Sequence, residues 1–353
     1  MPTDNVPTDD FPMDDFPTDH LSSGTAPKDV SAAGDTSQPR VPDPVAGENK
    51  SMRECLTALR SVPHEPGAAK PDPVVVVNGI RRTFGGLTAV DVDHLEIQRG
   101  VITALIGPNG AGKTTFFNLL TGFDQPDAGS WSFDGTPLKG KAAYKVARLG
   151  MVRTFQLTRV LSKLTVLENM RMGATGQRGE RLWAAALPAL WRAQERDITG
   201  RARDLLKRFK LDAKEEDFAG SLSGGQRKLL EMARALMVEP KLVMLDEPMA
   251  GVNPALKQSL LGHVKSLRDQ GMSVLFVEHD MDMVREISDW VVVMSQGKVI
   301  AEGPPASIMS DERVIDAYLG ARHDTDISEL EHVLKVEHAH DHAEQTADRE
   351  VPR

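Results

Sequence analysis

Three runs of apolar residues have the length and composition of buried β-strands. They are Val101–Ile106, Leu242–Leu245 and Ser273–Val277, and a glycine or a charged residue follows each within two positions. Continuous apolar runs of four to eight residues that end at turn or polar residues are typical of strands covered on both faces. The pattern therefore predicts three core strands.

Earlier in the chain, Val74–Ile80 and Val90–Ile97 also predict strands, although the apolar alternation of the second slips by one residue at His94. A turn rich in Asp and Gly precedes a further short strand near Trp131–Phe133. Gly150–Gln156 resembles a strand that ends in a polar side chain.

The apolar spacing changes to that of helices in other segments. Lys113–Leu120 follows the first core strand as a helix, and the stretch from Val166 to about Leu211 predicts several more. Within that stretch, two sets of residues recur at helical spacing: Trp183, Leu187, Leu190 and Trp191, and then Ile198, Ala202, Leu205 and Phe209. Pro188 is expected to kink or restart the first helix. We interpret the two tryptophans as packing residues, with a helix on a membrane surface as the alternative.

The two ends of the chain differ in composition from its centre. Residues 1–20 form four five-residue repeats with a proline in each, and acidic Asp residues follow the prolines. Such a segment cannot propagate helix or sheet, so we predict disorder, and we interpret the stretch from Leu21 to about Asp72 as a linker with a short helix-compatible patch near Ser51–Leu59. A docking role for Phe11 and Phe16 is an alternative to a solvated tail.

Charge follows the same division. Residues 1–70 carry a formal charge of −6 and residues 321–353 carry −5, whereas residues 71–320 carry +2. The nearly neutral centre gives no indication of a nucleic-acid-binding surface. The tail contains His332, His338, His340 and His342, which could bind a metal, but we interpret it as an acidic, weakly structured tail.

The sequence gives no sign of an intrachain disulfide, a membrane-spanning segment or a secretory signal. Cys55 is the single cysteine, so no disulfide can form within the chain, which fits a reducing cytosol. No apolar run approaches the roughly 20 residues that cross a bilayer, and the first twenty residues lack the features of a secretory signal.

The first candidate site follows the first core strand. It reads Gly107, Pro108, Asn109, Gly110, Ala111, Gly112, Lys113, Thr114 and Thr115, and matches the phosphate-binding pattern G-x-x-x-x-G-K-[ST]. The glycines allow backbone N–H groups to wrap phosphate oxygens, and the following helix points its positive end at the same anion. Lys113 is then expected to reach the β and γ phosphates, and the Thr114 hydroxyl to bind Mg²⁺. The alternative is a simple glycine-rich turn.

A second glycine-rich helix start lies at Leu222, Ser223, Gly224, Gly225 and Gln226. The helix predicted after it, from Arg227 to Met237, has apolar residues Leu230, Ala233 and Met237 at the proper spacing. Its backbone donors and dipole also suit an anion. The alternative is a helix capped by a serine.

Polar residues end the other two core strands. Asp246 and Glu247 are adjacent, and if both lie on a strand they point opposite ways, so that Asp246 faces Mg²⁺ while Glu247 activates the attacking water. His279 follows the third strand and is a candidate contact of the γ phosphate.

Together these motifs resemble the ATP-binding-cassette ATPases over about residues 74–320. The resemblance implies that Phe84 stacks on adenine, that Gly107–Thr114 is the Walker A loop, and that Gln156 belongs to the Q-loop and contributes to the Mg²⁺ site and to catalysis. It also implies that Leu222–Gln226 is the signature, that Asp246 and Glu247 are the Walker B aspartate and catalytic glutamate, and that His279 is the switch histidine. ATP and Mg²⁺ are the implied cofactors.

The family further implies an α/β fold, with a mostly parallel core sheet, an antiparallel β subdomain and a helical subdomain at about 157–237. The cassette would span residues 73–320, between the extension 1–72 and the tail 321–353. In this family ATP lies between the Walker A loop of one cassette and the signature of another, so a second cassette, identical or paralogous, is an expected partner.

Further runs narrow the resemblance to the ATP-binding subunits of branched-chain amino-acid importers. They are Phe84–Val90, Arg153–Gln156, Ala250–Pro254, Glu278–Met281 and Val314–Gly320. Most cassettes carry Asp at the position of Asn253, and the replacement of this Asp by Asn is itself similar to the subgroup. Importers of urea, amides or other small solutes share much of this pattern.

This resemblance implies membrane permease subunits as partners, a solute-binding protein as an indirect one, and a location on the cytoplasmic face of the membrane. The alternatives are a cassette ATPase that acts on nucleic acid or ribosomes, and a module that has lost catalysis. The single Walker A loop and the short segment between Gln156 and Ser223 disfavour the first, and the intact candidate catalytic residues disfavour the second.

Overall fold

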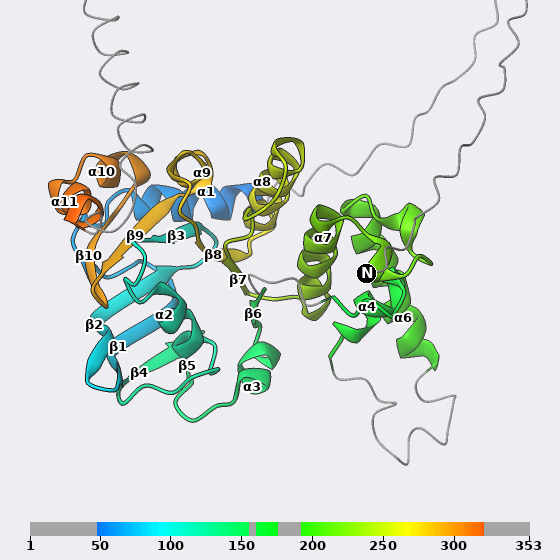
Figure 1. Ribbon diagram of the computed structural model, residues 1–353, viewed down its shortest axis with the longest axis horizontal. Coiled ribbons are helices and arrows are strands. Elements are labelled where there is room, and N and C mark those ends of the chain that lie inside the picture. The colour runs from blue at the N-terminus through cyan, green and yellow to red at the C-terminus, as the bar shows by residue number, and fades with distance from the viewer. Residues whose placement is uncertain (1–47, 155–159, 176–191, 321–353) are drawn as a thin grey trace, which may run out of the picture. The chain divides into compact units, whose positions relative to one another are not determined.

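The computed structural model of the chain describes residues 48–154, 160–175 and 192–320 (Figure 1). Its strands are β1 (Pro73–Phe84), β2 (Leu87–Gln98), β3 (Ile102–Ile106), β4 (Ala128–Phe133), β5 (Thr136–Pro137), β6 (Met151–Arg153), β7 (Leu242–Asp246), β8 (Ser273–Val277), β9 (Trp290–Ser295) and β10 (Lys298–Gly303). Its α-helices are α1 (Glu48–Leu59), α2 (Lys113–Leu120), α3 (Ala143–Arg148), α4 (Val166–Met172), α6 (Arg192–Arg208), α7 (Gly224–Ala235), α8 (Pro254–Asp269), α9 (Met281–Ile287), α10 (Pro305–Met309) and α11 (Glu312–Gly320).

The core sheet contains the three strands predicted from the apolar runs. Within the described residues its order is β10-β9-β3-β8-β7-β6, and every neighbouring pair is parallel except β10 with β9. All residues of β3, β7 and β8 are buried, as expected for strands covered on both faces. The predicted α/β fold with a mostly parallel core sheet is therefore confirmed. Because these strands run the same way, their carboxyl ends meet at one edge.

The second sheet is the predicted antiparallel part. Its order in the described chain is β2-β1-β4-β5, and β1 and β2 form a hairpin. The slip at His94 has a counterpart across the hairpin, where the buried residues of β1 pass from Val77 to Ile80. Between them Gly79 adopts a φ of 58°, and the pairing of β1 with β4 shifts at this point. The hairpin therefore changes its buried face at a glycine that tolerates left-handed backbone.

Helices α4, α6 and α7 contact one another. In α6 and the turn after it, Ile198, Ala202 and Phe209 are buried as their spacing predicts, and Leu205 is partly buried. The predicted face of the helix after the signature is confirmed as well, because Leu230, Ala233 and Met237 are buried. The tryptophan stripe and Pro188 lie outside the described residues. No helix in the described part of the chain is long and apolar enough to span a bilayer.

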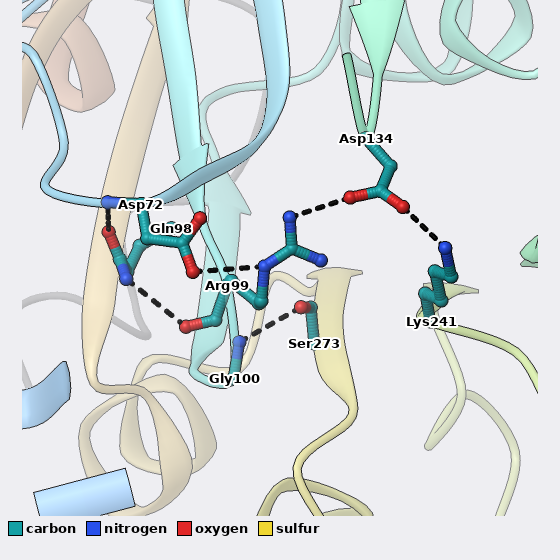
Figure 2. Close-up of polar contacts among 7 residues, drawn as sticks. All are labelled: Asp72, Gln98, Arg99, Gly100, Asp134, Lys241 and Ser273. Carbon is teal, nitrogen blue, oxygen red and sulfur yellow. Dashed lines mark hydrogen bonds and ion pairs between the residues drawn. The ribbon is translucent and has the colours of Figure 1, made fainter. Parts of the chain in front are cut away.

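A polar network joins the two sheets at the amino ends of the core strands (Figure 2). Arg99, just after β2, forms ion pairs with Asp72 (3.0 Å) and Asp134 (2.7 Å), and Asp134 also accepts a hydrogen bond from Lys241 ahead of β7. These contacts lower the pKa of the Asp134 carboxyl, Lys241 contributing most. The Gly100 N–H donates to the Ser273 hydroxyl at the start of β8 (2.9 Å).

The segment before β1 contains the predicted helix-compatible patch near Ser51–Leu59 as a helix, but it packs onto the fold, unlike the predicted linker. Residues 48–59 form helix α1, which contacts α8, and Leu59 and Val62 are buried in the core that underlies the antiparallel sheet. The repeats of residues 1–20 and the tail of residues 321–353 lie outside the described residues.

A buried ion pair holds the rest of that segment. The Lys70 ammonium lies 2.9 Å from Glu302 of β10, and both side chains are almost completely buried. Glu302 also accepts hydrogen bonds from the Trp290 indole (3.0 Å) and the Ala68 backbone (2.9 Å). This docking could not be predicted from the sequence, because Lys70 and its partner Glu302 are more than 230 positions apart.

Candidate functional site

The candidate phosphate loop joins β3 to α2 at the carboxyl edge of the core sheet. Gly107 has a φ of 148° and Gly112 a φ of 97°, and a Cβ at these positions would lie 2.0 Å from the Met294 carbonyl oxygen and 2.2 Å from that of Ala89. Only glycine allows the loop to pass this close to the neighbouring backbone. Helix α2 begins at Lys113, as predicted.

Lys113 and Thr114 begin that helix with different surroundings. The Lys113 ammonium donates hydrogen bonds to the carbonyl oxygens of Gly107 (2.6 Å) and Pro108 (2.9 Å) of its own loop. Burial lowers the pKa of Lys113, while attraction to the carboxylates of Glu247 and Asp246 opposes this shift. The structure thus brings the predicted lysine and both predicted carboxylates into one electrostatic site, and Thr114 is exposed beside it.

Asp246 and Glu247 lie where β7 ends, but they do not point apart through the alternation of side chains on one strand, as predicted. Asp246 is the last residue of the strand and is buried. Glu247 has left the strand, because its φ is 46°, and its N–H donates to the Val277 carbonyl at 3.0 Å. The expectation that both residues alternate on one strand was therefore wrong. A left-handed turn, uncommon for a residue with a side chain, separates the two carboxylates.

Arg153 is a charged neighbour of this site to which sequence reasoning assigned no role. It ends β6, and its guanidinium forms an ion pair with Asp246 at 2.5 Å, with about 5% and 6% of the two side chains exposed. It also donates to the Asn118 side chain of α2 at 2.6 Å. The only sequence signal for Arg153 is the run Arg153–Gln156, which resembles that of the branched-chain amino-acid importer subunits.

The two residues after β8 differ sharply in exposure. His279 is 68% exposed, and its Nδ1 lies 3.8 Å from the carboxylate of Glu278, which is buried. Glu278 accepts a hydrogen bond from the Met249 N–H at 3.0 Å, and burial raises its pKa. The histidine is therefore presented outward, while the glutamate before it anchors the loop that follows β7.

The predicted second anion-binding end is the start of α7. Ser223 caps the helix, accepting from the Gln226 N–H at 3.2 Å, while the Gln226 side chain accepts from the Ser223 N–H at 3.0 Å. The serine cap weighed as an alternative is thus present. It leaves the hydroxyl proton of Ser223 available to donate, and Ser223 and Gly224 are exposed.

Within the same chain α7 also contacts the loop after β7. Gly225 lies so close to α8 that an added Cβ would meet the Leu256 side chain. The Lys228 ammonium donates to the carbonyl oxygens of Pro248 (3.1 Å) and Ala250. These contacts were not anticipated from the sequence.

Phe84, the predicted adenine platform, ends β1 with 47% of its surface exposed. The Arg82 guanidinium covers its ring at 4.6 Å from the centroid. An exposed aromatic ring with a cation near it suits stacking on a base.

Comparisons with known proteins identify the family to which this arrangement belongs. The profile of the ABC transporter family matches residues 90–250, and that of the branched-chain amino acid ATP-binding cassette transporters matches residues 298–324. The chain is 41% identical over 249 residues to a probable branched-chain amino acid transport ATP-binding protein LivG of Archaeoglobus fulgidus, covering 70% of this chain and 96% of the relative. It belongs to the ABC transporter ATPases.

Other members of the family have similar coverage. The high-affinity branched-chain amino acid transport ATP-binding protein BraF of Pseudomonas aeruginosa is 40% identical over 251 residues, which are 70% of this chain and 98% of that protein. Among solved structures, the ADP conformation of an ATP-binding cassette of an ABC transporter matches with a TM-score of 0.62 and 36% identity, over 70% of this chain and 99% of that chain.

As an ABC transporter ATPase, the chain binds a nucleotide, and its residues also fit a magnesium ion. The exposed Thr114 hydroxyl and the buried Asp246 carboxylate offer the oxygen ligands that Mg²⁺ prefers. A bound Mg²⁺ would neutralise charge that develops on the phosphates. Gln156, predicted to join this metal site and catalysis, lies outside the described residues, as do residues 155–159 around it.

Proposed function

We propose that the chain is the ATP-hydrolysing subunit of an ABC importer for branched-chain amino acids. The observation that carries the proposal is about 40% identity to subunits named for branched-chain amino acid transport, over nearly their whole length. The match of residues 298–324 to the branched-chain amino acid ATP-binding cassette transporters supports the same substrate class.

In the core of the site, different residues bind the phosphates, hold Mg²⁺ and activate the water. The backbone of Gly107–Gly112 and the Lys113 ammonium hold the phosphates, and Thr114 and Asp246 hold Mg²⁺, with Gln156 as a further ligand. Glu247 orients and deprotonates the attacking water.

The remaining roles belong to three other parts of the site. His279 contacts the γ phosphate, and Phe84 stacks on the adenine. Ser223–Gln226 of a second cassette, identical or paralogous, completes the site. The exposure of Ser223 and His279 supports this pairing, because both remain open to a partner.

The remaining partners follow from transport. We infer that the subunit lies on the cytoplasmic face of the membrane against permease subunits, and that a solute-binding protein acts with it indirectly. The relatives named above are transport proteins, which favours transport over the alternative of an ATPase that acts on nucleic acid or ribosomes.

Uptake tests this function directly. Cells with and without this subunit are given labelled leucine, isoleucine or valine, with labelled urea as the competing solute. We expect loss of amino-acid uptake without the subunit and its return with the wild-type chain. Retained uptake of all three amino acids with lost uptake of urea would instead assign the importer to another solute.

Co-purification tests the partners. We expect two permease proteins to co-purify with the subunit, and recovery of ribosomes in their place would refute the transport function.

A further inference from the structure

The ion pair between Arg153 and Asp246 is among the most buried in the described chain, and it lies inside the nucleotide site. Its N–O distance is 2.5 Å, with only 5% of the Arg153 side chain exposed. The same guanidinium donates to Asn118 at 2.6 Å and lies 5.5 Å from the ring centre of Phe117. One side chain therefore links the end of β6, the helix after the phosphate loop and the carboxylate proposed to hold the metal.

The charge at this position has to be balanced. Asp246 is buried at the end of β7, and an ionised carboxylate in such a place is costly unless it has a cationic partner. The chain described here supplies that partner through Arg153. A Mg²⁺ ion bound with the nucleotide would offer the same carboxylate a second cation.

We propose that Arg153 is a positioning residue of the nucleotide site, whose guanidinium pairs with Asp246 and aligns its carboxylate before the metal is bound, and holds that carboxylate less tightly once Mg²⁺ shares it. The inference rests on the proposed role of Asp246. It gives Arg153, the first residue of the run Arg153–Gln156, a function of its own: this side chain ties the end of β6 to the carboxylate proposed to hold the metal.

The geometry explains why arginine is suited to this place. Its planar fork presents separate N–H groups, so that Nη1 reaches Asn118 while Nη2 reaches Asp246. Lysine could keep the positive charge but has no fixed fork, and would lose the simultaneous contact with α2. Backbone pairing continues past Arg153, since the Thr154 N–H donates to the Met244 carbonyl at 2.9 Å, so the strand itself stays aligned with β7.

Thermal unfolding of the full chain tests the proposal. Wild type, Arg153→Ala and Arg153→Lys are melted without nucleotide, with a non-hydrolysable ATP analogue in EDTA, and with the analogue and Mg²⁺. The matched control is Arg268→Ala, which removes a guanidinium from the largely buried carboxylate of Asp289 (3.0 Å), outside the nucleotide site.

Without metal, Arg153→Ala is expected to melt about 6 to 15 °C below wild type, because Asp246 loses its partner. With the analogue and Mg²⁺ this gap should fall to less than half, since the metal replaces the missing cation. Arg153→Lys should show a smaller gap that closes in the same way, and it decides the matter if the alanine variant does not fold. The gap for Arg268→Ala should stay constant in all three conditions.

Three outcomes overturn the proposal, and they are distinguishable. If the analogue with Mg²⁺ stabilises wild type but the gaps of both Arg153 variants stay unchanged, Arg153 is a structural residue only. If the analogue with Mg²⁺ does not stabilise wild type at all, the assignment of the nucleotide site fails as well. A gap that closes equally in EDTA would assign the exchange to the nucleotide, and would also refute the role of the metal.

Discussion

The chain presents two glycine-rich helix starts, and they are built differently. At the start of α2, Lys113 is partly buried and bonded to the carbonyls of its own loop, and the carboxylates of Asp246 and Glu247 lie within its electrostatic reach. At the start of α7, Ser223 is exposed and its capping bonds are closed within the helix.

This difference indicates that the half of the site at the start of α2 is organised within one chain, whereas the half at the start of α7 awaits a partner. The α2 end holds buried and partly buried charges of opposite sign that attract one another, so it is organised before a ligand arrives. At the α7 end the N–H groups of Ser223 and Gln226 are bonded within the capping box, and the Ser223 hydroxyl and Gly224 are exposed. We therefore expect changes at the first end to act on ATP binding and hydrolysis in every chain, and changes at the second end to act on hydrolysis only where two cassettes meet.

The largest effect is expected from Glu247→Gln. Removing the proposed general base should lower ATP turnover about 10³-fold while ATP affinity is kept. Steady-state hydrolysis and equilibrium binding measure the two separately. The control is Glu239→Gln, since Glu239 also has a positive φ of 53° but is exposed. Normal hydrolysis in the Glu247 variant would remove this residue from the role of base.

Lys113→Ala should weaken ATP binding about 100-fold, because a charge-assisted contact with the phosphates is lost from a partly buried position. Titration of a fluorescent ATP analogue measures the dissociation constant. Lys241→Ala, which removes a lysine from the network at the opposite ends of the strands, should bind as wild type does. Equal affinities for wild type and the Lys113 variant would contradict the phosphate-loop assignment.

Ser223→Ala separates the capping role of the serine from its proposed role toward a partner. Loss of the cap should cost about 1 kcal/mol, and loss of the phosphate contact should lower turnover about 10-fold without changing ATP affinity. Thr165→Ala is the matched control, because Thr165 and Glu168 form the same capping box at α4. Both variants should melt at similarly lowered temperatures, and only the Ser223 variant should hydrolyse slowly. Equal turnover in the two would leave Ser223 as a cap alone.

The smallest effect concerns Glu278, which anchors the loop after β7. Its pKa is raised by burial, so the folded chain binds its proton more tightly than the unfolded chain does. The free energy of unfolding should therefore decrease as pH rises from the unfolded pKa through the folded one. Glu278→Gln keeps an acceptor for the Met249 N–H and removes the charge. Its melting temperature should exceed that of wild type at pH 8 and approach it near pH 4; a constant difference across this range would contradict the prediction.

Much of the fold could be predicted because it depends on local patterns. The runs that became β3, β7 and β8 are apolar throughout, and such runs are buried in parallel sheets whatever lies beside them. Helix α2 has the predicted bounds because a glycine loop sets its start. Helix α1 covers the predicted helix-compatible patch, but its packing and the docking of Lys70 could not be foreseen, because residues 48–72 lack a long apolar pattern and are held by distant partners.

For the site, the sequence by itself determined which chemical groups are present: the glycine loop with Lys113, the paired carboxylates and the second glycine-rich helix start. Their residue types and spacing are local properties, readable along the chain. Only the tertiary structure decided that Glu247 leaves the strand in a left-handed turn and that Arg153 neutralises Asp246, 93 positions away. Such pairings depend on which strand ends the sheet brings together and on which buried charge needs a partner.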